Sequence, residues 1–260
     1  MKKSILITGA NGYVARALQK GLSAYDLTTI QRTDFDLTDQ KATEDFFKNK
    51  FFDVVIHTAI RGGRRLQQDD NEVFDGNVQM FLNLLKNKNS FGRFINLGSG
   101  AEVKETSTPY GFSKSVISNR LLSEPNFHNV RIYGIFDANE LSTRFIKANI
   151  TNYLNKQPMK VLQNKKMDFF YMPDLIKLID FLVAGKKPLK VIECCYDEAF
   201  SLSWIANFIN TLGSHKVDIK LASSDTDADY VGSNSAENLP IEFTGLIKGI
   251  RETFNILKNE

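Results

Sequence analysis

The chain has 260 residues, of which 42% are hydrophobic and 24% are charged, and its formal net charge is +3. This composition is typical of a globular protein and excludes a disordered or low-complexity chain. The charge is too small and too scattered to indicate binding to nucleic acid or to a membrane surface, which leaves small molecules, including anionic ones, as candidate partners.

Three sequence features bear on the cellular compartment. The chain passes from Met1 through two lysines directly into an apolar run, so we expect no signal peptide. No apolar run reaches about 18 residues, so we expect no membrane span. Cys194 and Cys195 are neighbours in an expected strand, where successive side chains point to opposite faces, and are therefore poor partners for a disulfide or a metal. We expect a cytoplasmic protein without a metal site.

In the first half of the chain, short apolar runs alternate with segments of helical spacing. Expected strands cover residues 5–7, 27–30, 54–56, 94–97 and 130–133, and expected helices begin near residue 14 and cover 42–47, 73–85 and 110–122. Strands that alternate with helices build right-handed βαβ units, which predict an α/β fold with a parallel sheet covered on both faces.

The pattern is less regular after residue 134. Expected helices cover residues 142–154, 173–184, 201–212 and 243–257, and short strands are expected at 160–162, 191–194 and 217–220. Such a C-terminal half could form a small cap over a cleft at the strand ends.

The segment after the first strand carries the strongest functional signal. Gly9 allows a tight turn, Gly12 lets the backbone approach a pyrophosphate without a Cβ atom in the way, and Ala15 lets the following helix pack closely on the strand. The start of that helix presents N–H groups and a positive dipole end to the phosphates. We therefore expect a Rossmann-type doubly wound parallel sheet that binds a dinucleotide. The residues expected to contact it here are Gly9, Asn11, Gly12, Tyr13 and Val14.

The end of the second strand bears on the choice of cofactor. A side chain that binds the ribose 2′-hydroxyl would be Asp or Glu at this strand end, whereas Arg32 stands near it and a guanidinium pairs well with a 2′-phosphate. We therefore expect NADPH rather than NADH. Two alternatives stay open: Arg32 is a solvated surface charge, or Asp34 bends back toward the ribose. Asp36 and Leu37 are expected where the adenine rests.

The third strand leads into the segment 57–63, in which small residues are followed by two glycines, a composition that suits close passage of a cofactor. His57 is expected to be a hydrogen-bonded core residue, because no second ligand or catalytic partner stands at a suitable spacing. The residues expected to contact the cofactor are Thr58, Ala59 and Ile60. A basic loop follows, with a phosphate-facing role left open for one of Arg61, Arg64 and Arg65.

Tyr110 and Lys114 are four residues apart in an expected helix, so both project from one face. An ammonium beside a phenol favours the phenolate, so we expect Lys114 and the positive nicotinamide of the oxidised cofactor to lower the pKa of Tyr110. Tyr110 would then serve as a general acid and base, and Ser99, at the end of the fourth strand, would hydrogen-bond the same substrate oxygen. The alternative is an exposed tyrosine beside a solvated lysine.

With these residues in this order, the chain resembles the extended short-chain dehydrogenase/reductases, the NAD-dependent epimerase/dehydratase family that acts on nucleotide-diphosphate sugars. Within the family it is most similar to GDP-fucose synthases and related 4-keto-6-deoxysugar reductases, over nearly its whole length. The matching segments are Arg32-Thr33, Asp36-Leu37-Thr38-Asp39, Phe46-Phe47, Ala59 with Gly62-Gly63, Asn77, Leu97-Gly98-Ser99, the segment 110–114, Tyr133-Gly134 and the segment 168–174.

The departures from the family pattern are informative. The cysteine and histidine with which GDP-fucose synthases move protons at the sugar C3 and C5 correspond to Ala101 and Arg144, and neither side chain is a proton carrier at neutral pH. The acid pair that sugar dehydratases carry after their Ser or Thr is replaced by Gly100-Ala101. The family's arginine near the substrate pyrophosphate falls on Met167. The resemblance therefore implies a reductase that has lost the epimerase pair.

Together with these residues, the resemblance implies NADPH-dependent reduction of the 4-keto group of a nucleotide-diphospho-4-keto-6-deoxyhexose, without epimerisation. The expected catalytic residues are Ser99, Tyr110 and Lys114, and Tyr110 and Lys114 are also expected to contact the cofactor. The residues expected to bind the sugar nucleotide are Ser99, Gly100, Ala101, Tyr110 and Arg144. We expect residues 1–165 to form the NADP-binding domain and residues 166–260 a substrate-binding subdomain interleaved with its sheet.

Two other functions stay open, an epimerase that keeps its NAD bound and a non-catalytic NAD(P)-binding sensor. The resemblance also implies a homodimer formed through the helices at 73–85 and 110–122. Phe74, Met80 and Phe81 are either the contact residues or part of the core.

Overall fold

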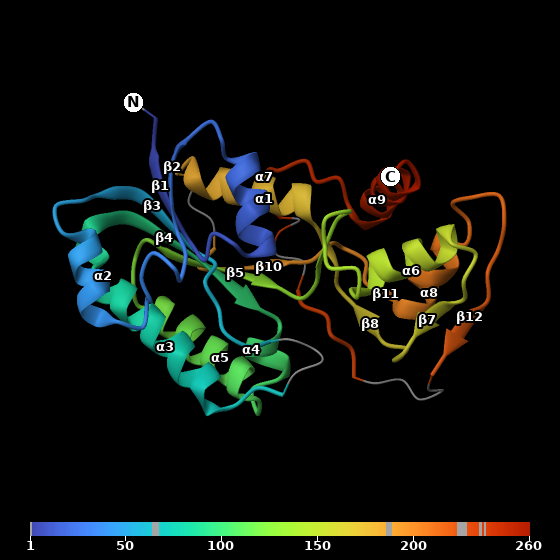
Figure 1. The fold of residues 1–260 in the computed structure, drawn as a ribbon, viewed down its shortest axis with the longest axis horizontal. Helices are drawn as coiled ribbons and strands as arrows, with labels where there is room; N and C mark the ends of the chain where they lie inside the picture. Colours follow the sequence, from blue (N-terminus) through green and yellow to red (C-terminus); the bar gives the residue numbers. More distant parts are fainter. Residues whose placement is uncertain (1, 64–67, 186–188, 223–227, 234–235, 237) are drawn as a thin grey trace. The chain divides into compact units, whose positions relative to one another are not determined.

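The computed structural model describes residues 2–63, 68–185, 189–222, 228–233, 236 and 238–260. The chain divides into two compact units, one formed by Met1–Arg131 and Ile179–Ile192 and the other by Ile132–Leu178 and Glu193–Glu260 (Figure 1). The first unit ends earlier than the boundary expected at residue 165, and it includes a later segment that carries part of the last strand of the sheet. That one unit binds the cofactor and the other the substrate stays a prediction.

A six-stranded sheet forms the centre of the first unit. Its strands run in the order β10-β5-β4-β3-β1-β2, and the pairs β1–β2, β1–β3 and β3–β4 are parallel. The strands are β1 (Ser4–Thr8), β2 (Asp26–Ile30), β3 (Phe52–His57), β4 (Phe91–Ser99), β5 (Phe127–Ile132) and β10 (Val191–Cys194). The predicted doubly wound α/β sheet is confirmed. The apolar run 5–7 is fully buried in β1, as expected for a parallel strand covered on both faces.

Helices cover both faces of this sheet, with α1 on one face and α2, α3 and α5 on the other (Figure 1). They are α1 (Tyr13–Gly21), α2 (Gln40–Phe47), α3 (Asn71–Lys86), α4 (Ala101–Lys104) and α5 (Pro109–Leu121), with a 3-10 turn at Lys88–Ser90. Asp39, Asp70 and Thr108 accept backbone N–H groups at the starts of α2, α3 and α5. The sequence missed α4, because a single turn is too short to show a helical period.

The second unit contains helices, short paired strands and a core of its own. Its helices are α6 (Phe145–Leu154), the first part of α7 (Met172–Val183), α8 (Leu202–Ile209) and α9 (Leu246–Lys258). Its strands pair as β6 (Ile135–Phe136) with β9 (Phe170–Tyr171), β7 (Met159–Val161) with β12 (Ile219–Leu221), and β8 (Lys166–Met167) with β11 (Phe200–Ser201). The four predicted helices are confirmed, whereas the two-residue strands were missed because they are too short for an alternating pattern.

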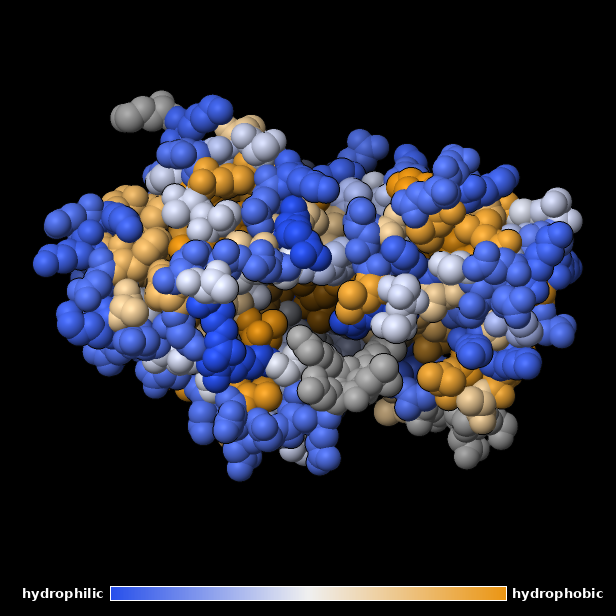
Figure 2. Space-filling view, viewed as in Figure 1, coloured by the Kyte–Doolittle hydropathy of each residue, from blue (hydrophilic) through white to orange (hydrophobic). Residues whose placement is uncertain are grey.

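Apolar side chains are mostly buried in both units. Hydrophilic residues cover most of the face seen in Figure 2, and apolar residues reach it only in small groups. Within the described part of the chain, no helix combines the length and the apolar character needed to cross a bilayer. Cys194 and Cys195 are both buried free cysteines.

A buried carboxylate fastens the segment before α9 to the start of α7. Asp174 accepts the N–H groups of Thr244 at 2.8 Å and Gly245 at 3.0 Å, the hydroxyl of Tyr196 at 2.6 Å and the ammonium of Lys177 at 3.0 Å. Burial by itself would raise the pKa of Asp174, but these donors outweigh it and hold the pKa below its ordinary value.

We expect Asp174→Asn to lower the free energy of unfolding by about 2–3 kcal/mol at neutral pH, because the amide cannot accept all four donors. Since the folded pKa of Asp174 is lowered, its contribution is present above the unfolded pKa of about 4 and is lost as the pH falls through the folded value. The difference in the free energy of unfolding between wild type and Asp174→Asn, measured in urea, should therefore become smaller in acid. The exposed control Glu198→Gln should change stability at neither pH, and a difference that grows in acid would contradict the prediction.

Candidate active site

The site is organised at the point where the strand order of the sheet reverses. From β1 the chain goes to β2 on one side and to β3 on the other, and doubly wound sheets bind their ligands beyond the carboxyl ends of the strands at such a point. Gly9, which follows β1, has φ +69°, and a Cβ atom on it would lie 2.7 Å from the Cα atom of Ala59, after β3. Only glycine combines this backbone conformation with so close an approach.

The turn after β1 fits a pyrophosphate. The N–H of Gly12 donates to the carbonyl of Gly9 at 2.9 Å, which closes the turn. Gly12 is the N-cap of α1 and makes no side-chain hydrogen bond to the helix. The N–H groups at the start of the helix are therefore not capped by a side chain of this residue and suit an anion. Asn11 is exposed at the turn, and Tyr13 and Val14 are partly buried in the first turn of the helix. Their contact with a cofactor stays a prediction.

The end of β3 is held to β1 by hydrogen bonds. The hydroxyl of Thr58 donates to the carbonyl of Thr8 at 2.6 Å, and the N–H of Ala59 donates to the hydroxyl of Thr8 at 3.3 Å. The Nδ1 atom of His57 lies 2.9 Å from the same hydroxyl. Burial lowers the pKa of His57 to about 3, so the ring is neutral, and the prediction of a hydrogen-bonded core histidine is confirmed. Ile60, which follows Ala59, is exposed.

The end of β2 is followed by charged residues that are paired with one another. The carboxylate of Asp34 accepts the N–H of Gln31 at 2.9 Å, so it closes its own turn. Arg32 lies at the surface, with 76% of its side chain exposed, and its Nε atom is 3.3 Å from a carboxylate oxygen of Asp36. Leu37 is buried in the core beneath. Of the basic loop, Arg61 is described, whereas Arg64 and Arg65 lie outside the described residues.

Ser99, Tyr110 and Lys114 come together where β4 ends and α5 begins. Pro109 and the Thr108 cap start the helix, which places Tyr110 and Lys114 one turn apart. Ser99 and Tyr110 are hydrogen-bonded through their side chains. The ammonium of Lys114, a residue only 5% exposed, donates to the carbonyl of Leu97 at 2.6 Å and lies 5.9 Å from the centre of the Tyr110 ring.

The pKa of Tyr110 differs from the expectation. Burial raises it, and the negative charge of Glu102 adds to the rise, although the hydrogen bond with Ser99 lowers it. The prediction of a lowered pKa is wrong here, because burial of the phenol outweighs the effect of the ammonium, which lies 5.9 Å from the ring centre. Burial lowers the pKa of Lys114 to about 8, with Glu102 opposing that shift. Tyr110 is therefore a protonated phenol at neutral pH.

The glycine-rich loop after β3 also shapes this site. Gly63 has φ +70°, and a Cβ atom on it would lie 2.8 Å from the ring of Tyr110. Its N–H donates to both carboxylate oxygens of Asp69 at 3.1 Å. At Gly63 the ring of Tyr110 occupies the space that a side chain would take, and the close passage of a cofactor along this segment stays a prediction.

A buried ion pair behind the site was missed by the sequence analysis. Glu102, whose side chain is 1% exposed, pairs with Arg131 of β5 and accepts the side-chain N–H of Asn129 at 2.8 Å. Asn129 also accepts from Asn96 at 2.7 Å and donates to Ser118 at 3.0 Å. One signal was available: an arginine in an apolar strand needs a buried acceptor.

The residues expected to bind the sugar belong to both units. Ser99 and Tyr110 are adjacent, and Gly100 and Ala101 are buried at the start of α4. Arg144 belongs to the other unit, where it is exposed directly before α6. Binding of a substrate by these five residues stays a prediction. Among the described residues, no group of three or more His, Cys, Asp or Glu side chains could hold a metal ion.

A doubly wound parallel sheet with a glycine turn at its switch point defines a dinucleotide-binding protein. Residues 5–194 match the profile of the NAD dependent epimerase/dehydratase family. The chain therefore belongs to this family and is an NAD(P)-dependent oxidoreductase, which confirms the resemblance drawn from the sequence.

Three solved structures illustrate what the chain is similar to. MlghC, a GDP-mannoheptose C4 reductase from Campylobacter jejuni with NADP bound, matches with a TM-score of 0.83 at 13% identity, over 99% of this chain and 98% of that chain. A GDP-6-OMe-4-keto-L-xylo-heptose reductase from C. jejuni gives 0.81 at 15% identity over the same shares. A GDP-L-fucose synthetase from Naegleria fowleri gives 0.73 at 18%, over 99% and 93%. At such identities the likeness shows a shared fold. A sequence search of curated proteins gave no match.

Proposed function

We propose that this protein reduces the 4-keto group of a nucleotide-diphospho-4-keto-6-deoxyhexose with NADPH, without epimerising the sugar. The observation that carries the proposal is the contact of Ser99 with Tyr110, one helical turn before Lys114, at the carboxyl end of β4. Ligands of doubly wound sheets bind at this edge, beyond the strand ends. Structures similar to this chain include two keto- or C4-reductases of GDP sugars.

Each residue has a role that follows from its chemistry. When bound, NADPH supplies the hydride that reduces the keto carbon. Tyr110 donates its proton to the keto oxygen, and its raised pKa keeps that proton in place at neutral pH. Ser99 holds and polarises the same oxygen. Lys114 places a positive charge beside the ring and anchors the ribose next to the nicotinamide.

The absence of epimerisation rests on the residues beside Ser99. Ala101, two residues later, carries a methyl group and is buried at the start of α4, so it cannot exchange a proton with a sugar carbon. We also propose that the first unit binds the cofactor and that the second unit supplies most of the sugar-binding residues. A cytoplasmic location fits the two buried free cysteines.

The proposal is tested by mixing the purified protein with NADPH and a panel of GDP-, dTDP- and CDP-4-keto-6-deoxyhexoses. We expect loss of NADPH absorbance with at least one sugar and no solvent deuterium at C3 or C5 of its product. No oxidation of NADPH with any sugar would contradict the reductase. NAD retained through purification, together with interconversion of sugar epimers, would instead favour an epimerase.

We also propose a homodimer formed by α3 and α5. Phe74 of α3 and Phe112 of α5 stack with ring centres 5.1 Å apart, and Phe112 is 51% exposed, so the two helices share an apolar surface. Met80 and Phe81, the other candidates from the sequence, are buried in the core.

We expect Phe112→Asp to convert a dimer into a monomer, because a carboxylate on each subunit would be buried at the centre of the contact. Sedimentation or gel filtration with light scattering measures the mass. The matched control is Phe51→Asp, since Phe51 is equally an exposed phenylalanine, at 61%, but lies outside both helices. A wild-type monomer, or a dimer that survives Phe112→Asp, would refute this contact.

A further inference from the structure

Asp36, which follows β2, forms ion pairs with two arginines through a single carboxylate oxygen. The Oδ2 atom of Asp36 lies 3.2 Å from Nη2 of Arg61 and 3.3 Å from Nε of Arg32. The other oxygen, Oδ1, accepts the N–H and the hydroxyl of Thr38 at 2.9 Å and 2.8 Å. Burial alone would raise the pKa of Asp36, but these hydrogen bonds and the two guanidiniums lower it, so the residue is a carboxylate at neutral pH.

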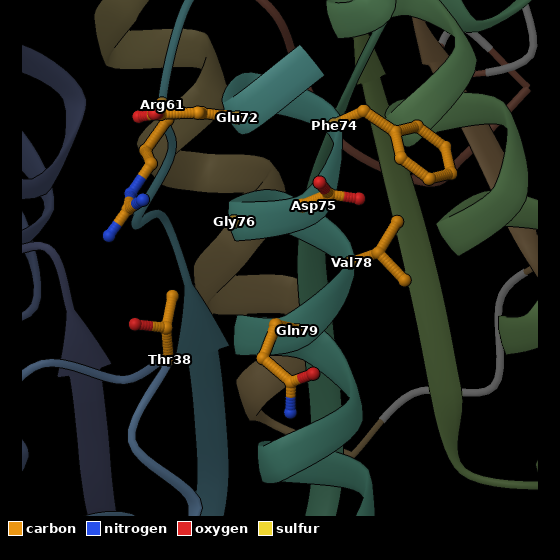
Figure 3. A pocket seen from close by; sticks show the side chains of 8 residues that line it. All are labelled: Thr38, Arg61, Glu72, Phe74, Asp75, Gly76, Val78 and Gln79. Atoms are coloured by element: carbon orange, nitrogen blue, oxygen red, sulfur yellow. The ribbon is translucent and has the colours of Figure 1, made fainter.

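The position of Arg61 is built by α3. The N–H of Arg61 donates to the side-chain oxygen of Asn77 at 2.8 Å, and its carbonyl accepts from the side-chain nitrogen at 3.1 Å. Its side chain passes Gly76, on which a Cβ atom would lie 2.7 Å from Cδ and 2.9 Å from Nη1 of Arg61 (Figure 3). A glycine inside a helix costs stability relative to alanine, and here it leaves the space that the arginine fills.

Arg61 remains open to a ligand. Its side chain is 30% exposed, and it borders a hollow of about 460 Å³ whose walls include Thr38, Gly76 and Gln79 (Figure 3). The backbone bonds and Gly76 limit where this side chain can lie, in contrast with Arg32, which is 76% exposed.

Within this ion-paired group the charges do not cancel, because two guanidiniums face a single carboxylate, and Arg61 and Arg32 are each within ion-pair distance of Asp36 through one nitrogen. Glu72 and Asp75 also line the hollow, but neither is ion-paired with Arg61 or Arg32 among the described contacts. The remaining N–H donors of two neighbouring guanidiniums suit the several oxygens of a phosphate group. In a doubly wound sheet, the end of the second strand is where the adenosine ribose is bound and where its 2′-substituent is distinguished.

We propose that Arg61 and Arg32 together bind the 2′-phosphate of NADP, with Asp36 holding the two guanidiniums side by side and Gly76 making room for Arg61. This proposal rests on the proposed use of NADPH. It assigns the selection of NADPH to Arg61 as well as to Arg32, although Arg61 lies 29 positions beyond Arg32 in the chain. Gly76 and Asp36 act through the arginines and need not touch the phosphate.

The test compares two fragments by calorimetry, 2′,5′-ADP and 5′-ADP, which differ only in the 2′-phosphate, so that no sugar or turnover is needed. Wild type should prefer 2′,5′-ADP. Arg61→Ala should weaken 2′,5′-ADP about 10-fold or more and change 5′-ADP by less than about 2-fold, since one charged hydrogen-bonded contact is lost. Arg120→Ala, an arginine at the far end of α5, should change neither.

Gly76→Ala provides a second variant that keeps every charge. The added methyl displaces the flexible Arg61 side chain while alanine favours the helix, so affinity for 2′,5′-ADP should fall and thermal stability should not. A wild type without preference for 2′,5′-ADP would refute the proposed use of NADPH. A selective wild type whose selectivity survives both Arg61→Ala and Gly76→Ala, or an equal loss for both fragments, would refute the role of Arg61 alone.

Discussion

Tyr110→Phe is expected to lower kcat for keto reduction by about 1000-fold while changing the affinity for NADPH by less than about 3-fold. The substitution removes one hydroxyl, and general acid catalysis by a positioned side chain contributes roughly 100- to 10000-fold. Because the pKa of Tyr110 is raised, the phenol is the acid form at neutral pH, and the substitution also removes its hydrogen bond with Ser99. Stopped-flow single turnovers measure the chemical step, and fluorescence titration measures cofactor binding.

The matched control is Tyr25→Phe in the same unit. The hydroxyl of Tyr25 donates to Asp180 at 2.7 Å, so this change also removes a bonded phenol, but one that lies outside the site. It should leave kcat unchanged. If Tyr110→Phe keeps a third or more of wild-type kcat, Tyr110 is not the acid, and the function proposed for the site loses its main support.

Glu102→Gln is expected to destabilise the protein by about 3–5 kcal/mol, because breaking a buried ion pair leaves the remaining charge without compensation. Glu102 is almost completely buried, and Arg131 is only 14% exposed, so water cannot replace the lost partner. The side-chain N–H of Asn129 donates to Glu102, and in this variant its acceptor would no longer be charged. Urea unfolding gives the change in free energy, and a loss of several degrees in Tm should accompany it.

Two further variants separate charge pairing from packing. Glu102→Gln with Arg131→Met removes both charges and should recover a large part of the lost stability, as apolar replacements of buried pairs often do. Glu105→Gln, three residues later and exposed, should have no effect. A double variant less stable than Glu102→Gln alone would mean that Arg131 contributes through other contacts.

The two predictions separate the residue proposed to donate the proton, Tyr110, from the buried residue behind the site, Glu102. The acidic charge of Glu102 adds to the rise in the pKa of Tyr110 that burial causes, and it opposes the lowering of the pKa of Lys114 by burial. Loss of Glu102 should therefore affect folding first, whereas loss of the Tyr110 hydroxyl should affect only turnover.

The sequence by itself determined the features that depend on neighbouring residues. The glycine turn of residues 9–12 and the spacing of Tyr110 and Lys114 are local, because a tight turn and one helical turn are set within a few positions. The alternation of strands and helices likewise predicted the sheet, since βαβ units are joined with one handedness.

Only the tertiary structure decided which groups meet across long separations. Asp36 meets Arg61 and Glu102 meets Arg131 from different elements, 25 and 29 residues apart, and no sequence period links such pairs. The state of Tyr110 was also beyond the sequence: its pKa depends on burial and on Glu102, while the ammonium expected to lower it is bound to the carbonyl of Leu97. Spacing along a helix fixes a shared face, but desolvation and long-range charge pairing exist only once the chain has folded.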